Sequence, residues 1–165
     1  MRDKSGGPLM DQAIHVLDIH RYIAGEVKLV HAFGNNQIQP KRDEFTVEET
    51  VVMNLSFDTD VISSHTHSWA CNVNIAQIEL ISDLSRVAID LFANRVFGKV
   101  EGVDIDEKMG DDPKMTEVDN FLNAVETKDQ SILRSSYQDA VNTCAVTWAG
   151  LKSIDTGEAQ SPLHF

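Results

Sequence analysis

Apolar side chains at helical spacing mark the first element of the chain. Proline suits the first helical turn, because its missing N–H would have no partner there, and glycine readily ends a helix in the left-handed conformation. Pro8 and Gly25 occupy these two positions. Between them, the apolar residues that share one helical side are Met10, Ala13, Ile14 and Leu17. We therefore predict a helix from Pro8 to Ala24.

The middle of the chain alternates between apolar and polar residues, which is typical of β-strands with one buried face. The predicted strands are Val27–Phe33, Thr50–Phe57, Val61–Trp69, Ile75–Ile81, Arg86–Phe92 and Val96–Ile105. Short polar turns at residues 58–60 and 82–85 predict two hairpins. The polar segment 37–48, which contains Pro40, is predicted to be a loop.

Helical spacing returns after the strands. One helix is predicted over residues 116–127, with Thr116 as its N-cap. A longer helix is predicted from Ser135 to Ser153. Its predicted buried side consists of Tyr137, Ala140, Val141, Cys144, Ala145, Trp148 and Leu151. Gly157 and Pro162 are expected to lie in an exposed tail.

The order of the elements predicts an α+β fold, because one helix precedes the strands and two helices follow them. We expect an open, largely antiparallel or mixed sheet of about five or six strands, with helices on one face. The domain is expected to span residues 1–155, with residues 156–165 as a tail. The uncovered face of such a sheet needs a partner domain or a second copy of the chain.

Composition narrows the classes of partner. The 165 residues carry a formal net charge of −12, which opposes binding to nucleic acids and to anionic membranes. No apolar run is long enough to span a bilayer, and the first residues lack a signal-peptide pattern, so a cytoplasmic location is expected. Cys71 and Cys144 have no metal-ligand spacing, and both are expected to be reduced and buried.

Titratable residues follow one face of the predicted first helix. Asp11, His15, Asp18 and Tyr22 are spaced so that they fall within about 60° of arc. An aspartate and a histidine one turn apart can interact directly, and such a histidine can move a proton to or from a hydroxyl near neutral pH. Spacing alone also fits an ordinary solvated face. The glycine pair at 6–7 would let a ligand or backbone approach the helix start closely.

The segment around this face resembles a family signature. Residues 6–18 are similar to the Gly-Gly-x-x-x-Asp-x-x-x-His-x-x-Asp motif of the Gfo/Idh/MocA oxidoreductases, the relatives of glucose–fructose oxidoreductase and inositol dehydrogenase. The resemblance continues through Val47–Thr50 and through the two closing helical segments, so it covers essentially the whole chain. It implies the C-terminal domain of that family, with a dihydrodipicolinate-reductase-like fold.

The resemblance also implies roles for individual residues. In this family a Rossmann domain binds NAD or NADP, and the second domain supplies the substrate pocket and the oligomer contact. Asp11 and His15 match the acid/base pair beside the substrate hydroxyl, and Asp18 is assigned a structural role. Gly7 and His15 would contact a sugar, polyol or inositol-like substrate.

The chain departs from the family pattern at two functional points. It contains no Gly-x-Gly-x-x-Gly strand–turn–helix unit. The Glu-Lys-Pro motif has no counterpart either, since Lys4 and Pro40–Lys41 lie in other contexts. We therefore expect the N-terminal Rossmann domain to be absent, so that this chain alone binds no cofactor and completes no reaction. The alternative is a stand-alone dimeric or small-polyol-binding module without catalysis.

Two histidines on a predicted strand form a second candidate patch. His65, His67 and Trp69 alternate, so their side chains share one face. With Asp11 and His15, the two histidines could supply four metal ligands if the first helix lay over that face. No cysteine or further histidine cluster supports a metal, and we expect none. The favoured interpretation is a polar patch at the substrate pocket or at a subunit interface.

Overall fold

The structure is a computed structural model that describes residues 5–38, 45–108, 110 and 112–163. Its contacts divide the chain into two compact units, which are Met1–Asn72 with Ser135–Phe165, and Val73–Arg134. Lys4 and Pro40–Lys41, the lysines considered for the family's catalytic motif, lie outside the described residues. Within the described ranges, no helix is long and apolar enough to cross a membrane.

The predicted first helix is confirmed, with a difference in its first turn. A short π-helix, η1 (Leu9–Ala13), leads directly into α2 (Ile14–Ala24). Gly25 ends α2 with a φ of 92°, a conformation that favours glycine. Leu9 and Ala13, at the two ends of the π turn, are both fully buried. Single π turns within helices occur often at functional sites, and this one carries Asp11.

Three antiparallel strands form the sheet of the first unit, in the order β1 (Val27–Asn35), β2 (Thr50–Phe57) and β3 (Ile62–Ser68). The predicted alternation is observed, because every second residue of β2 from Val51 to Phe57 is buried. The buried face of the sheet belongs to the hydrophobic core, and the opposite face carries partly exposed side chains.

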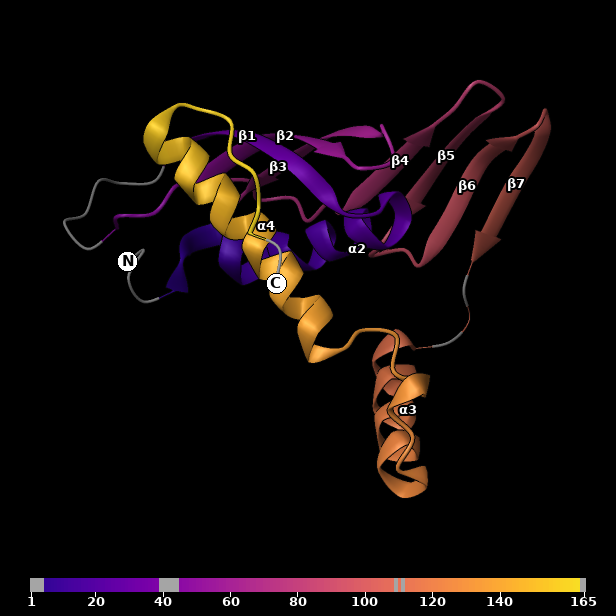
Figure 1. Ribbon diagram of the computed structural model, residues 1–165. Helices are drawn as coiled ribbons and strands as arrows, with labels where there is room; N and C mark the ends of the chain where they lie inside the picture. The colour runs from indigo at the N-terminus through magenta and orange to yellow at the C-terminus, as the bar shows by residue number, and fades with distance from the viewer. Residues whose placement is uncertain (1–4, 39–44, 109, 111, 164–165) are drawn as a thin grey trace. The chain divides into compact units, whose positions relative to one another are not determined.

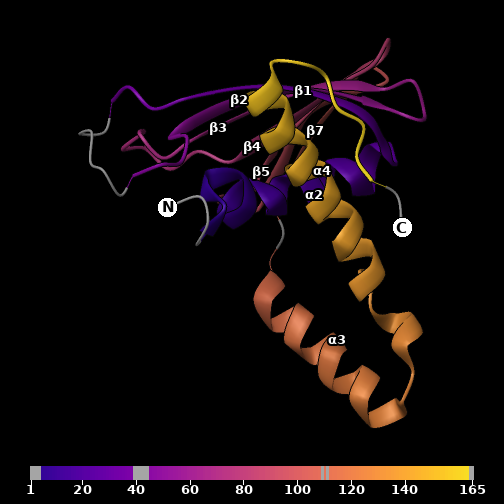
Figure 2. The ribbon, with the colours of Figure 1, turned by 60° about the vertical axis from the view of Figure 1, so that its left-hand side comes forward.

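Helices α2 and α4 (Tyr137–Thr156) cover the same face of this sheet (Figures 1 and 2). The buried residues of α4 are mostly small or polar: Thr143, Val146, Thr147, Ala149, Gly150, Leu151 and Ser153. A Cβ on Gly150 would lie 2.9 Å from Met53 Cε and 3.3 Å from Leu9 Cδ1. The small residues therefore let α4 approach the core closely.

The predicted packing side of this last helix is wrong for its bulky aromatic residues and Cys144, although Leu151 is buried as predicted. Tyr137 is 88% exposed and Trp148 is 61% exposed, and Cys144 is exposed as well. Because the helix meets the core through small side chains, its bulky residues lie on the solvent side. Cys71 is also exposed, so the expectation of two buried cysteines is wrong too.

The segment after α4 is tied to the sheet. The backbone N–H groups of Val30 and Gln160 each donate to the other's carbonyl oxygen at 2.8 Å. Pro162 is buried, whereas Gly157 is exposed. The expectation of an exposed tail is therefore wrong for Pro162, because the bridge at Gln160 holds this segment against β1.

Four antiparallel strands form the sheet of the second unit, in the order β4 (Gln77–Ile81), β5 (Ser85–Asp90), β6 (Arg95–Val100) and β7 (Val103–Lys108). The single strand predicted over 96–105 is instead a hairpin. Glu101 and Gly102 have φ values of 48° and 83°, and two successive positive φ values are the conformation of a tight two-residue hairpin turn.

The second unit ends with α3 (Pro113–Thr127) and a short 3-10 turn, η2 (Gln130–Ile132). Asp112, rather than the predicted Thr116, caps α3, since its carboxylate accepts from the Lys114 N–H. Proline takes the first helical position after this cap, so the helix begins earlier than the apolar stripe indicated.

The predicted α+β class with open, antiparallel strand pairing is confirmed, but the strands form two sheets where one was expected. The described strands number seven and form two sheets of three and four strands. They exceed the expected number because the turn at Glu101–Gly102 divides the last predicted strand in two. Each strand pair within the described ranges is antiparallel.

Candidate functional site

The candidate acid/base residues lie on the solvent side of the first helix. Asp11 is in the π turn η1 and His15 is in the first turn of α2, and both side chains are exposed. Within the described part of the chain, no hydrogen bond or ion pair joins Asp11 to His15. The direct contact expected from their spacing is therefore not present. Asp11 instead acts electrostatically on His67 of β3.

Asp18 and Tyr22, the other two residues of the predicted helix face, differ in their contacts. Asp18 accepts a 2.6 Å hydrogen bond from the Thr143 hydroxyl of α4 and lies 3.7 Å from the Arg21 guanidinium. Asp18 thus ties the first helix to α4, which fits a structural role. Tyr22 is 75% exposed at the far end of α2.

Arg21 is the centre of this helix–helix contact. Its guanidinium donates to both carboxylate oxygens of Glu26, at 2.6 and 3.1 Å. It also donates to the backbone oxygen and one carboxylate oxygen of Asp139, and to the Thr143 hydroxyl. These bonds fix the position of α2, and therefore of His15, relative to α4.

The glycine pair before the helix has a packing role. Gly6 and Gly7 have φ values of 70° and 73°, in the left-handed region that favours glycine. A Cβ on Gly7 would lie 2.9 Å from Cβ of Val47, so that residue fills the space beside the glycine. The pair thus lets the chain turn tightly into the helix that carries Asp11.

Three histidines meet where α2 crosses β3. His65 is 5% exposed, its ring is edge-on to His20 at a centroid distance of 5.8 Å, and it stacks parallel to His67 at 6.2 Å. The His20 Nδ1 and the Ser63 hydroxyl share a hydrogen bond of 3.2 Å. His65 of the strand therefore does lie beside the first helix, through His20, and His67 stacks on it.

Burial keeps these imidazoles neutral. It lowers the pKa of His65 to about 4, and the neighbouring His20 and His67 lower it further. Burial also lowers the pKa of His20 and of His67, although Asp11 opposes the change at His67. The Nε2 atoms of His65 and His67 are buried and have no hydrogen-bond partner within the described residues. Two imidazole nitrogens are thus buried polar atoms without a partner among the described residues.

The structure does not bring the four proposed metal ligands together. Among the described residues, no group of three or more histidine, cysteine, aspartate or glutamate side chains is arranged to hold a metal ion. Asp11 acts electrostatically on His67, whereas His15 does not contribute to the pKa shifts of His65 or His67. The metal alternative therefore gains no support from the geometry.

Sequence reasoning missed two residues that join the first helix to the β3 region, His20 and Gln12. His20 follows Ala13 and Leu17 at helical spacing, so its position on the buried side could have been found from periodicity. Gln12 accepts a hydrogen bond of 2.8 Å from the Trp69 indole N–H. No sequence signal identified that pair, because it joins residues far apart in the chain.

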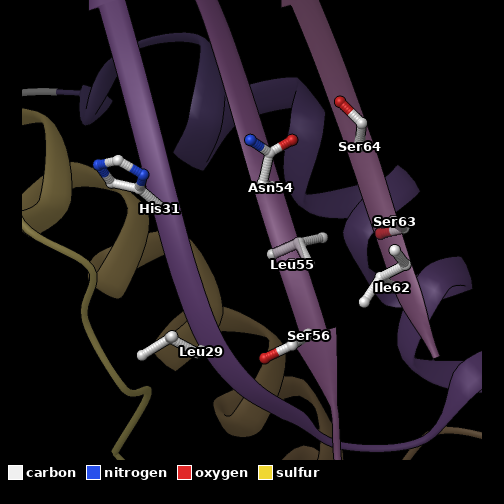
Figure 3. Close-up of a pocket in the computed structure, with 8 residues that line it drawn as sticks. All are labelled: Leu29, His31, Asn54, Leu55, Ser56, Ile62, Ser63 and Ser64. Atoms are coloured by element: carbon white, nitrogen blue, oxygen red, sulfur yellow. The ribbon is translucent and has the colours of Figure 1, made fainter. Parts of the chain in front are cut away.

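The opposite face of the first unit's sheet has a shallow hollow (Figure 3). Side chains from all three strands line it: Leu29, His31, Asn54, Leu55, Ser56, Ile62, Ser63 and Ser64. It lies on the face away from α2 and α4. The hollow and the histidine cluster lie on different faces of the sheet and share one residue, Ser63. The mixture of apolar and hydroxyl groups in the hollow fits a contact surface.

Comparisons with known proteins identify relatives. A family model described as the GFO/IDH/MocA C-terminal domain matches residues 1–84. No curated protein matches the sequence. A levoglucosan dehydrogenase solved with NADH and levoglucosan has a TM-score of 0.85 and 16% identity, with 96% of this chain and 51% of that chain covered.

Two further solved structures agree with this match. An oxidoreductase domain protein from Kribbella flavida has a TM-score of 0.83 and 16% identity, over 99% of this chain and 52% of that chain. An oxidoreductase from Agrobacterium radiobacter, in complex with NAD+, L-tartaric acid and magnesium, has a TM-score of 0.74 and 15% identity, over 93% and 48%. The chain thus spans about half the length of these structures and shares the fold of that half.

Proposed function

Because this chain belongs to the GFO/IDH/MocA C-terminal domain family, we propose that it is the substrate-binding and oligomerisation portion of an NAD(P)-dependent oxidoreductase. The substrate class is a sugar, polyol or inositol-like hydroxyl compound. The observation that carries the proposal is the pairing of the Asp11–His15 helix with the neutral His65 and His67 on the facing strand. The solved levoglucosan dehydrogenase, which holds NADH and levoglucosan, is consistent with this class.

In this proposal, each side chain has a role in binding or proton movement. Oxidation of a secondary alcohol removes a proton from oxygen and a hydride from carbon. His15 takes the hydroxyl proton, or returns it in the reverse direction, and Asp11 stabilises the positive charge that develops nearby. The neutral imidazoles of His65 and His67 bond other hydroxyls of the substrate, and Gly7 shapes the approach to the helix start.

The proposal places the cofactor outside this chain. A dinucleotide site of the Rossmann type needs parallel strands joined by a helix, with a glycine-rich turn. The strand pairs in the described ranges are all antiparallel, which does not fit such a site. NAD or NADP would therefore bind to a separate nucleotide-binding domain, and the chain alone would be inactive.

Calorimetry tests the proposal directly. The chain should take up no measurable NADH or NADPH, whereas levoglucosan or myo-inositol should bind weakly. Asp11→Asn and His15→Asn should each weaken sugar binding without unfolding the protein, because both side chains are exposed. Lys152→Gln on α4, also exposed, is the matched control. Tight binding of a nicotinamide cofactor, or sugar binding unaffected by both variants, would contradict the proposal.

The alternative function is a stand-alone dimeric or small-polyol-binding module without catalysis. The hollow on the open sheet face favours self-association, which both functions require. The two functions differ when a nucleotide-binding domain of a relative is added to the chain. Recovery of NAD-dependent alcohol oxidation, lost again in His15→Asn, supports the oxidoreductase and excludes the alternative.

A further inference from the structure

A hydrogen bond joins the first helix to the residue that directly follows β3, close in sequence to Asp11 and His67. The indole N–H of Trp69 donates to Gln12 Oε1 at 2.8 Å, and the backbone N–H of Trp69 donates to the Glu49 carbonyl at 2.7 Å. The ring is therefore fixed both by its backbone and by its polar edge. An indole held in this way has little freedom to turn.

The position of this ring is set by two neighbouring contacts. Trp69 comes directly after the last residue of β3, Ser68, and two residues after His67. Gln12 directly follows Asp11 in the π turn. Asp11 acts electrostatically on His67 while Gln12 bonds Trp69, so the indole is held by the residue that directly follows the candidate acid.

The polar groups and the flat indole at this place match the two kinds of surface on a cyclic sugar. Such a ring carries hydroxyls around its edge and apolar C–H groups on its faces. Neutral imidazoles and a carboxylate can bond the hydroxyls, whereas a partly exposed indole offers a flat apolar surface to the C–H groups. Its polar edge is already occupied by Gln12, so the ring face is what remains for a ligand.

We propose that Trp69, held by Gln12, is the aromatic platform on which the substrate ring stacks, and that it selects cyclic over open-chain polyols. The proposal rests on the proposed function, because it names the substrate class of the same site. Gln12 is a positioning residue that acts through Trp69. A flat indole face matches a closed ring better than a flexible open chain, which loses more conformational freedom on binding.

The chain contains a built-in control. It has two tryptophans, and Trp148 on α4 is more exposed than Trp69 and lies on a different surface, beside Val141 and Cys144. A sugar that stacks on any exposed indole would therefore affect Trp148 at least as strongly. Each tryptophan gives its own indole N–H signal in a ¹H–¹⁵N NMR spectrum, and Trp148→Phe assigns the two signals.

The experiment is a titration of the 165-residue chain with levoglucosan, myo-inositol and the open-chain polyol sorbitol, followed by NMR. We expect a cyclic probe to shift the Trp69 indole signal and to leave the Trp148 signal in place. Trp69→Ala should weaken cyclic binding roughly five- to tenfold, in line with the strength of aromatic contacts. Trp148→Ala should not weaken it, and Gln12→Leu should weaken it less than Trp69→Ala. Sorbitol should bind more weakly than either ring.

The outcomes separate the two proposals. A cyclic probe could bind the unmodified chain, bind the His15→Asn variant more weakly, and yet leave the Trp69 signal unmoved. In that case the platform is overturned and the proposed function stands. Equal shifts of both tryptophans, or sorbitol binding as tightly as the rings, also overturn the platform. If no probe binds at all, the proposed function fails and the platform fails with it. The Trp69 signal of the unmodified chain gives this result even if Trp69→Ala does not fold.

Discussion

His65 of β3 stands edge-on to His20 of α2, with ring centroids 5.8 Å apart and ring planes at 83°. His67 stacks parallel to His65 at 6.2 Å. Burial lowers the pKa of all three, and Asp11 is the carboxylate that acts on one of them, His67. The first helix thus meets its strand through imidazoles that must remain uncharged.

Acid is therefore expected to destabilise the first unit. The pKa of His65 falls from 6.5 to about 4 on folding, so the unfolded chain binds a proton at pH values where the folded chain does not. The stability that neutral His65 contributes is complete above pH 6.5 and is lost as the pH falls toward 4. Urea unfolding at a series of pH values measures this slope.

A pair of variants tests the assignment of that slope. His65→Gln removes the titrating ring and should flatten the pH dependence between 6.5 and 4. His31→Gln, on the opposite face of the sheet, should leave the slope as it is in the unmodified chain. A slope that is the same in His65→Gln and in the unmodified chain would contradict the assignment.

Arg21→Met should destabilise the protein by about 2–3 kcal/mol, because several charge-assisted hydrogen bonds of a buried guanidinium are lost. The Arg21 side chain is 4% exposed, while its partners Glu26 and Asp139 are each about 40% exposed and remain hydrated. Urea unfolding gives the change. Arg86→Met, which breaks an exposed ion pair with Glu79, should have little effect. Equal effects of the two variants would show that burial does not matter here.

Much of the fold could be predicted from the sequence, because alternation and helical spacing are local patterns. The hairpin of β2 and β3 and the ends of the first helix follow directly from the residues between Pro8 and Gly25 and between Thr50 and Trp69. The packing side of α4 could not be predicted. Hydrophobicity favoured Trp148, but close approach to the core required small residues such as Gly150.

The candidate site was only partly predictable for a similar reason. Asp11 and His15 were identified by spacing within one helix, and His65 and His67 by alternation within one strand. Which of them face each other depends on how the helix crosses the sheet. The π turn and the crossing place Asp11 near His67, whereas Asp11 and His15 make no bond within the described residues.

Gly7→Ala should cost about 2 kcal/mol, because two separate effects add. The φ of Gly7 is 73°, which strains any other residue, and the new Cβ would lie 2.9 Å from Cβ of Val47. Gly157→Ala is the matched control, since its φ is 72° but nothing lies within 4 Å of the added carbon. That variant should cost about 1 kcal/mol. If thermal unfolding shows the same loss of stability for both variants, the contact with Val47 contributes nothing and backbone strain explains the whole effect.

The open face of the first unit's sheet is the proposed oligomer contact, and charge placed there should separate the subunits. Phe33 and Ile62 are 58% and 80% exposed, and exposed apolar side chains of this size gain free energy when a second copy covers them. Phe33→Glu and Ile62→Glu should therefore convert an oligomer to a monomer in sedimentation experiments, while leaving the unfolding midpoint of the monomer nearly unchanged. Tyr137→Glu on α4, where the side chain is 88% exposed, should leave the oligomer intact. If Tyr137→Glu dissociates the oligomer and the two strand variants do not, the contact lies on α4. If the unmodified chain is a monomer at all concentrations, the oligomerisation role is refuted.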